Sequence, residues 1–370
     1  MRSTASRDGA TAAGSGWGAW LGPLLGRGGE TAPGGPGGFR HRLSDLVDAG
    51  HPVPPGVVVG PVWSGGTAIR AARWMAPEAA PGSIEAPGSG SEGASRTAGT
   101  VLICTGRSEF IEKYLPVVAE LRERGFAVAV FDWRGQGMSQ RPLRNGHKGH
   151  VEHFSDYEGD LLAVAEQVLE PFCPKPWFGL AHSMAGAIAL NVAADRPDLF
   201  RRLVLSAPMV EIARLPLKAT ARAVARLCRY GGLARSFVPG GRGRALLFGS
   251  FEGNLLTSDE ARYQAVLDYL RADPRLTLGA PTLGWLHAAF TAMARLHEDD
   301  YPERMRTPVL AVVPGFDRVV ESRATERLVS RLRASRVVTV PGSRHEVLME
   351  RDVFRRQFWA AFDAFVPGTD

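Results

Sequence analysis

Short apolar segments recur along the chain, and segments of helical character follow most of them. These apolar segments carry almost no charge, as is typical of strands that are buried on both faces of a parallel sheet. They cover residues 101–104, 126–131, 177–182, 203–206, 308–313 and 336–340. Strands that alternate with helices indicate an α/β fold, with a mostly parallel central sheet and helices on both faces.

The alternation stops after residue 208 and resumes near residue 303. Helices are predicted here over 215–227, over 261–270 and from 279 onwards, with no strand between them. A helical block inserted between two core strands is typical of a lid over a pocket. The predicted division is a core at 53–208 and 303–370 with a lid insertion at 209–302.

The N-terminal residues 1–52 are expected to be a disordered tail, because they are rich in Gly, Ala, Ser and Pro and lack a periodic apolar pattern. The apolar stretch 17–25 is too short, and too often interrupted by Gly and Pro, to span a bilayer. Residues 67–75 are predicted to form an edge strand of the first hairpin. Residues 77–99 are predicted to form a long loop.

Composition limits the classes of partner. The chain has 370 residues, 45% of them hydrophobic, and a net charge of +6. No basic stripe with interleaved aromatic residues is present, so no nucleic-acid partner is expected. The basic residues of the predicted lid form either the solvated face of a helix or a contact with an anionic membrane surface. They are Arg214, Lys218, Arg222, Arg226 and Arg229.

The cysteines point to a reducing compartment. Cys104, Cys173 and Cys228 are scattered, and their spacing indicates neither a disulfide framework nor a zinc site. We therefore expect a cytoplasmic protein, which lies at the membrane surface if the lid makes the contact described above.

One stretch predicts a nucleophile. The apolar segment 177–182 runs directly into Ser183, and an Ala-rich helical segment follows. Small residues, Ala181 and Ala185, lie two positions to either side of the serine. A serine on a sharp strand-to-helix turn needs small residues there, because larger side chains would collide with the adjacent strand and helix. The usual form has Gly at both positions; here both are Ala, and Gly186 lies one position later.

Two later residues complete a catalytic set. Asp317 and His345 each come directly after a predicted strand, at the same edge of the sheet as Ser183. A serine hydroxyl needs a base to become a nucleophile, and an imidazole base needs an anion to orient it. The chain order Ser, Asp, His is that of the α/β-hydrolases.

An oxyanion site is expected beside the serine. The backbone N–H of Met184 begins the helix that follows Ser183, and its position suits a donor to a developing oxyanion. The second expected donor is the backbone N–H of Arg107, in the turn that follows strand 101–104.

Other polar residues have weaker interpretations. His147, His150 and His153 recur at every third position, but their segment is rich in glycine, so we expect a loop and no metal site. Asp132 is expected to cap its own loop, because it precedes the nucleophile in the chain. His182 is expected to point away from Ser183.

Several motifs together resemble the lysophospholipase L2-like and monoacylglycerol lipase-like branch of the α/β-hydrolases. They lie at residues 105–114, 131–139, 181–186, 254–259 and 342–346, and the resemblance covers about 60 to 366. It implies hydrolysis of a carboxylic ester of a single-chain lipid, a lysophospholipid or a monoacylglycerol. The catalytic route through Ser183 needs no metal and no organic cofactor.

Two alternatives stay open at this point. The same triad can serve a proline iminopeptidase-like peptidase or a general carboxylesterase. A peptidase needs acidic groups to capture a free amino terminus, and Glu211, Glu252 and Glu298 are the candidates. The other alternative is a protein that binds a ligand in the pocket without catalysis.

Overall fold

One central sheet organises the computed structural model, which describes residues 43–77, 98–213, 218–243 and 249–366. Its strands are β1 (Val57–Ser64), β2 (Thr67–Trp74), β3 (Thr100–Cys104), β4 (Ala127–Phe131), β5 (Trp177–His182), β6 (Arg202–Ser206), β7 (Val309–Pro314) and β8 (Ser335–Val340). Their spatial order is β1-β2-β4-β3-β5-β6-β7-β8. The pairs β1–β2 and β2–β4 are antiparallel and all others are parallel, so the predicted mostly parallel sheet is confirmed.

The predicted edge position of strand 67–75 is wrong. β2 pairs with β1 on one side and with β4 on the other, and most of its residues are buried. The edge is β1, where Val58 and Trp63 are 51% and 56% exposed. β2 contributes apolar side chains to both hydrophobic clusters, Ile69 and Ala71 to one and Ala72 and Trp74 to the other.

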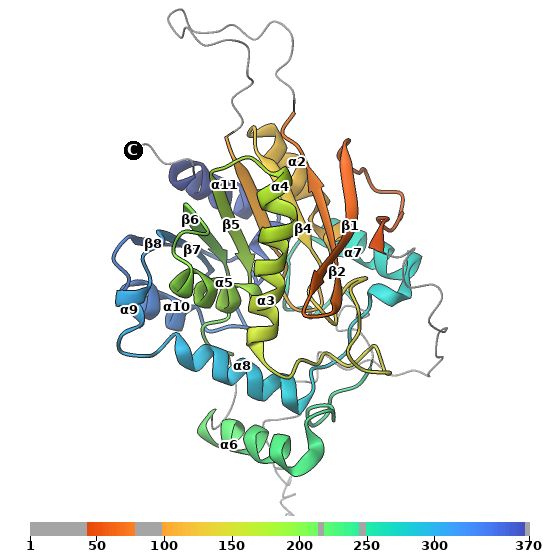
Figure 1. Cartoon of the computed structure of the whole chain (residues 1–370), viewed down its shortest axis with the longest axis vertical. Coiled ribbons are helices and arrows are strands. Elements are labelled where there is room, and N and C mark those ends of the chain that lie inside the picture. The colour runs from red at the N-terminus through yellow and green to blue at the C-terminus, as the bar shows by residue number, and fades with distance from the viewer. Residues whose placement is uncertain (1–42, 78–97, 214–217, 244–248, 367–370) are drawn as a thin grey trace, which may run out of the picture.

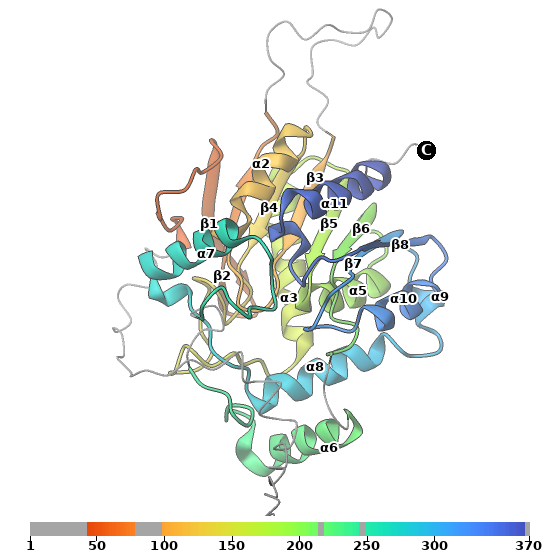
Figure 2. The same ribbon diagram turned by 180° about the vertical axis from the view of Figure 1, so that it is seen from behind.

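Helices cover both faces of the sheet (Figure 1, Figure 2). They are α2 (Leu115–Glu123), α3 (Phe154–Val164), α4 (Glu170–Phe172), α5 (Met184–Asp195), α6 (Lys218–Cys228), α7 (Glu260–Ala272), α8 (Leu283–Arg295), α9 (Tyr301–Arg304), α10 (Ser322–Val329) and α11 (Asp352–Phe365). Short 3₁₀ or π segments are η4 (Ile111–Tyr114), η5 (Ala165–Leu169), η6 (Arg229–Leu233), η7 (Pro274–Leu276) and η8 (Val347–Met349). Figure 1 shows α3 and α5 in front of the sheet, and Figure 2 shows α2 and α11 on the opposite face.

Two hydrophobic clusters form the core, one on each face. One joins the sheet to α3, α5, α8 and α10, and the other joins it to α2, α7 and α11. The parallel strands β3, β5 and β7 are buried throughout their length, which explains why their sequences carry no polar alternation. Burial of this much apolar surface is the main force that stabilises the fold.

The helical block 209–302 divides into two parts. α6 packs on α8, which in turn contacts α5 and α3, and this pair lies below the sheet in Figure 1. α7 lies apart from them, against η4. α6 begins at Lys218, while residues 215–217 of the predicted helix lie outside the described part of the chain.

The packed region begins earlier than the predicted boundary at residue 53. Leu43 is buried, the Val47 N–H donates to Glu112 Oε1 at 2.8 Å, and His51 pairs with Asp268. Residues 43–52 are therefore part of the folded body and not of a tail. The predicted tail segment 1–42, with its apolar stretch 17–25, and the predicted loop residues 78–97 lie outside the described residues.

No helix in the described ranges combines the length and the apolar character that crossing a bilayer requires.

Candidate active site

Ser183 lies on a strained turn between β5 and α5. Its backbone has φ 52° and ψ −115°, a conformation that a non-glycine residue rarely adopts. The turn is held by backbone hydrogen bonds: Ser183 N–H donates to Ser206 O at 3.0 Å, and Ser183 O accepts from the N–H groups of Gly186 and Met209. This conformation places the serine at the end of the strand where the helix begins, as the sequence predicted.

Small residues are required around this turn for different reasons. Ala181 and Ala185 are fully buried. A Cβ at Gly186 would lie 2.5 Å from Pro208 Cβ and 2.7 Å from Pro208 Cα. The close approach of this backbone segment therefore explains why glycine stands at 186 and alanine is tolerated at 185.

The structure brings Ser183, His345 and Asp317 together. His345 Nε2 lies 2.9 Å from Ser183 Oγ, and His345 Nδ1 lies 2.8 Å from Asp317 Oδ2. Ser183 follows β5, Asp317 follows β7 and His345 follows β8, so three parallel strands deliver the side chains to one edge of the sheet. All three side chains are nearly inaccessible to solvent.

Asp317 is held as an anion. Burial alone would raise the pKa of this carboxyl, but the neighbouring His345 and the backbone N–H groups of Val319 and Val320 outweigh burial, so the pKa lies below its ordinary value. Those N–H groups donate to Asp317 Oδ1 at 2.7 and 3.0 Å, which leaves Oδ2 for His345. A carboxylate in this position can orient the imidazole and stabilise an imidazolium.

Two backbone N–H groups beside Ser183 have no acceptor among the described residues: those of Arg107 and Met184. Gln136 connects their two segments. Its Oε1 accepts from the Ser108 N–H at 2.5 Å, and its Nε2 lies 3.9 Å from Met184 Sδ. Ser108 has φ 65°, a second strained non-glycine position next to the site. This geometry leaves both predicted donors available to a ligand.

A buried ionic network lies directly behind these residues, and the sequence analysis missed it. The Glu109 carboxylate accepts from the Gly106 N–H and pairs with Lys113 at 2.8 Å and with His182 at 3.1 Å. Lys113 also pairs with Glu346 at 2.6 Å. The only signal was the charged spacing 109, 112, 113, which is equally typical of a solvated helix face.

The surroundings of Glu109 and His182 favour the charged form of each group. Burial alone would raise the pKa of Glu109, but Lys113 and His182 outweigh it, so the pKa is well below its usual range. Burial alone would lower the pKa of His182, but Glu109 outweighs it, so that pKa is raised. The His182 ring lies 4.9 Å from the His345 ring and is directed to Glu109, in agreement with the expectation that it points away from Ser183.

The histidines of the 147–153 loop go to separate partners. His150 Nδ1 lies 2.8 Å from Thr282 Oγ1 and its Nε2 lies 3.1 Å from Glu152 Oε1, while His147 Nδ1 lies 3.3 Å from Thr277 Oγ1. Within the described residues, no group of three or more His, Cys, Asp or Glu side chains is arranged to hold a metal ion.

Asp132 caps its own loop, as predicted. It accepts from the N–H groups of Ile111 and Met138 at 2.9 and 2.8 Å and pairs with the buried Arg70 at 2.7 Å. The glycines of this loop, Gly135 and Gly137, have φ 76° and 49°, positive values that glycine adopts readily in a tight turn.

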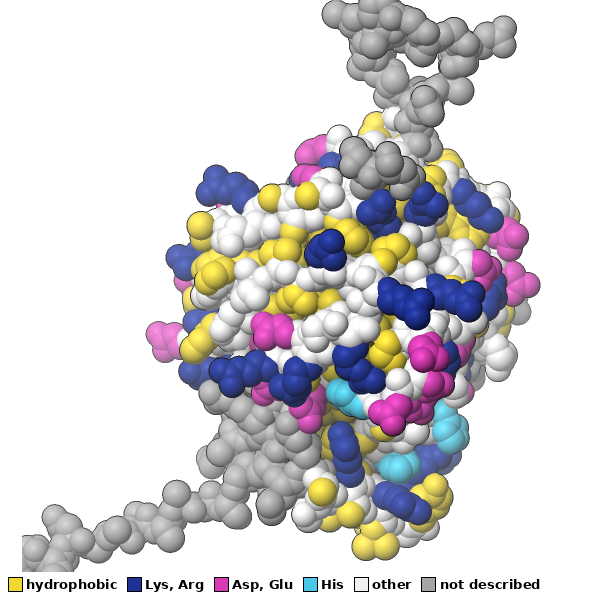
Figure 3. All heavy atoms as spheres, turned by 90° about the vertical axis from the view of Figure 1, so that its left-hand side faces the viewer, with side chains coloured by type: hydrophobic (Ala, Val, Ile, Leu, Met, Phe, Trp, Pro, Cys, Tyr) yellow, Lys and Arg dark blue, Asp and Glu magenta, His cyan; other side chains and the backbone are white. Residues whose placement is uncertain are grey.

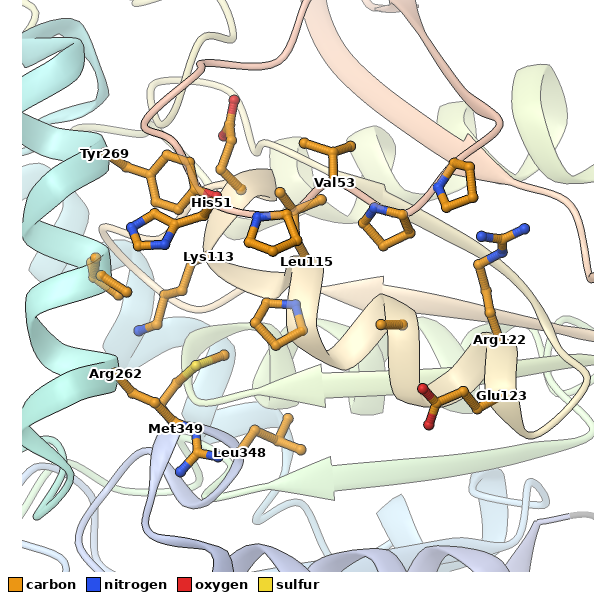
Figure 4. Close-up of a pocket in the computed structure, with 18 of the residues that line it drawn as sticks. His51, Val53, Lys113, Leu115, Arg122, Glu123, Arg262, Tyr269, Leu348 and Met349 are labelled. Carbon is orange, nitrogen blue, oxygen red and sulfur yellow. The ribbon is translucent and has the colours of Figure 1, made fainter.

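A cavity of about 580 Å³ lies elsewhere, between residues 51–55, α2 and α7 (Figure 4). Val53, Leu115 and Tyr269 are among the side chains that line it, and none of the triad residues does. The three reacting side chains lie at the edge of the sheet and not in this cavity, so the candidate active site is the sheet edge.

Comparison with known proteins agrees with this geometry. The profile of the Hydrolase_4 family, described as serine aminopeptidase, S33, matches residues 95–352. Lysophospholipase L2 of Escherichia coli is 33% identical over 271 residues, which cover 69% of this chain and 76% of that protein. A probable lysophospholipase L2 of Haemophilus influenzae is 29% identical over 267 residues, covering 72% and 83%.

Solved structures show the same fold. The crystal structure of a soluble variant of monoglyceride lipase from Saccharomyces cerevisiae, in complex with a substrate analog, superimposes with a TM-score of 0.62. That similarity covers 85% of this chain and 96% of that one, at 20% identity. Because the family profile spans most of the sequence and the sheet carries the nucleophile turn at its parallel edge, the chain belongs to the serine aminopeptidase S33 family of α/β-hydrolases.

Proposed function

We propose that this protein hydrolyses the carboxylic ester of a single-chain lipid, a lysophospholipid or a monoacylglycerol, through an acyl-enzyme on Ser183. The observation that carries the proposal is His345, which lies within hydrogen-bond distance of Ser183 on one side and of Asp317 on the other. The lipid class is supported by the similarity to lysophospholipase L2 of Escherichia coli.

The reaction begins with proton transfer. His345 Nε2 accepts the Ser183 hydroxyl proton as Oγ attacks the ester carbonyl carbon, and Asp317 stabilises the imidazolium that forms. His345 then donates that proton to the alcohol oxygen of the leaving glycerol portion, and the acyl group remains on Ser183. Water, activated by His345 in the same way, releases the fatty acid and restores the serine.

The negative charge on the carbonyl oxygen is stabilised by backbone donors. The N–H groups of Arg107 and Met184 bind the oxyanion, and Met184 adds the positive end of the α5 dipole. The Glu109 carboxylate holds the adjacent Gly106 N–H, so the ionic network behind the site keeps this loop in position.

The block 209–302 acts in this proposal as the lid, and α6 as its outer element. Ala221 and Ala225 face α8 and are buried, whereas Val224, Leu227, Tyr230 and Leu233 are between 39% and 75% exposed. Arg222 and Arg226 are exposed beside them. Figure 3 shows hydrophobic and basic side chains together at the lower end of the molecule, where Figure 1 places α6. An apolar face flanked by cations suits a contact with a membrane surface that carries anionic lipid.

One of the basic residues named in the sequence differs from that expectation. Arg229 is not a free surface cation, because it pairs with Glu152 at 3.1 Å and is largely buried. Arg214 and the side chain of Lys218 lie outside the described residues.

The peptidase alternative draws its support from the family's name. A free amino terminus needs an acidic receptor, but the Glu298 carboxylate pairs with Arg304, Glu252 is exposed on a turn, and Glu211 lies 4.0 Å from Arg327. These three carboxylates therefore give no common receptor, and we favour the ester hydrolase.

A substrate panel tests the proposal. We expect the protein to release fatty acid from 1-oleoyl lysophosphatidylcholine or 1-monooleoylglycerol, and to be inactive on aminoacyl p-nitroanilides. Ser183→Ala is expected to lower kcat on the order of 10⁶-fold, because the triad acts as a unit. Faster turnover of the anilides than of the esters, or full ester turnover by Ser183→Ala, would refute the proposal.

A further inference from the structure

The side chain of Arg107 is a partly buried cation without an acidic partner among the described residues. Its Nη2 donates to Gly279 O at 2.5 Å and its Nη1 donates to Ser108 Oγ at 3.1 Å. No carboxylate of the described residues lies within ion-pair distance of the guanidinium, and its Nε–H has no acceptor. Burial lowers the pKa of Arg107 to about 10, so the group stays protonated at neutral pH.

Three other arginines of low exposure are paired with carboxylates. Arg70 binds Glu112 and Asp132, Arg134 binds Asp160, and Arg355 binds Glu120. Arg141 also lacks a carboxylate partner, but it donates to three backbone carbonyls, those of Gly135, Gly137 and Arg275. A charge that is taken from water without compensation is costly, so a protein that keeps one uses it for a ligand or for a structural contact.

The position of the guanidinium favours a ligand. Arg107 and Ser108 retain part of their surface accessible, whereas Gly106 and Glu109 on either side are buried. The guanidinium lies 5.4 Å from the Trp285 ring of α8, and a Cβ at Gly149 would lie 2.5 Å from Nη2. Glycine at 149 and the indole of the proposed lid therefore leave room for this cation, which belongs to the same residue as the predicted oxyanion donor, the Arg107 N–H.

We propose that the Arg107 guanidinium binds the phosphate of a lysophospholipid whose ester is held at Ser183. This inference rests on the proposed function and narrows its substrate class. The Arg107 N–H would bind the ester oxyanion while the same residue's side chain binds the phosphate, with the glycerol backbone between them. The planar fork of arginine matches a phosphate group, and a monoacylglycerol offers no such anion.

The test compares two lipids with the same acyl chain. For 1-oleoyl lysophosphatidylcholine and 1-monooleoylglycerol, the ratio of kcat/KM values cancels any loss that both substrates share. We expect Arg107→Met to lower this ratio about 10- to 100-fold, the usual range for a charge-assisted hydrogen bond. Arg107→Lys should recover part of it, since the charge remains and the fork is lost.

Arg141→Met is the matched control, because Arg141 is also deep, uncompensated by acid and bound to carbonyl oxygens. We expect it to leave the ratio at the wild-type value. An unchanged ratio in Arg107→Met would show that the guanidinium only ties the loop to Gly279, and would overturn the inference. A wild-type protein that cleaves monooleoylglycerol but discriminates against the lysolipid would also overturn it, while leaving ester hydrolysis intact. Failure to cleave any ester would refute the proposed function instead.

Inhibition separates the two sources of phosphate. Glycerophosphocholine should compete with the lysolipid in the wild type and lose this effect in Arg107→Met. If inorganic phosphate competes as strongly as glycerophosphocholine, the site binds free phosphate and the assignment to a lipid headgroup is wrong.

Discussion

At the scale of single residues, the site depends on backbone that is held in sparsely populated conformations. Ser183 and Ser108 both have positive φ, and both flank the proposed oxyanion site. Such conformations cost of order 1–3 kcal/mol each and persist only where packing determines them. The close approach of Gly186 to Pro208 is one such packing constraint.

Gly186→Ala tests that constraint. The added methyl group would overlap Pro208, so we expect a loss of about 1–3 kcal/mol in the free energy of unfolding and a displaced nucleophile turn with lower kcat. Ala185→Gly is the matched control, with an expected loss of about 1 kcal/mol. Urea unfolding and ester turnover check both variants. Equal losses of unfolding free energy and of kcat in the two variants would contradict the assigned role of Pro208.

The pKa of His182 gives a prediction about pH. Because this pKa is raised in the folded protein, the stabilisation is complete below the unfolded value of about 6.5 and is lost as pH rises through the folded value. The groups that face the ring are Glu109, Lys113, Glu346 and His345. We expect the stability difference between wild type and His182→Gln, measured by urea unfolding, to shrink as pH rises above about 6.5. A difference that grows with pH would contradict the charged state of the network.

At the scale of elements, the strands and helices themselves were easier to predict than which of them lie side by side. The parallel strands and α5 follow from apolar runs and an Ala-rich segment. The edge position of β1 did not follow from the sequence, because period-two patterns do not identify which strands pair. The ion pairs of η4 also escaped prediction: Glu109 and Lys113 resemble a solvated helix face until the fold buries them against His182 and Glu346.

The exposed face of α6 and of the adjoining η6 carries a prediction of its own. Leu227 and Tyr230 are 74% and 75% exposed, so replacing both by Asp should not disturb the core. If this face contacts the membrane, the double variant should bind anionic vesicles at least about 10-fold more weakly and cleave vesicle-bound substrate more slowly. Val353→Asp, at a 50% exposed position on α11, is the control. If the double variant loses activity on soluble p-nitrophenyl butyrate as well as on vesicle-bound substrate, the loss would instead indicate damage to the active site.

At the scale of the whole molecule, the sequence was sufficient to predict the fold class and the residues that converge. Ser183, Asp317 and His345 are far apart in the chain, and each follows a parallel strand, so their meeting at one edge follows from topology. The division of the inserted block 209–302 into two separately packed parts did not follow from the sequence. α7 packs against η4 and residues 43–52 join the body, and such contacts depend on surfaces that only the folded chain creates.

In the proposed mechanism His345 activates Ser183, and this activation can be measured with a fluorophosphonate probe. Mass spectrometry of the labelled protein should find one adduct, on Ser183, and His345→Ala should slow labelling on the order of 10³-fold or more. An adduct on another residue, or equally fast labelling of His345→Ala, would contradict the claim.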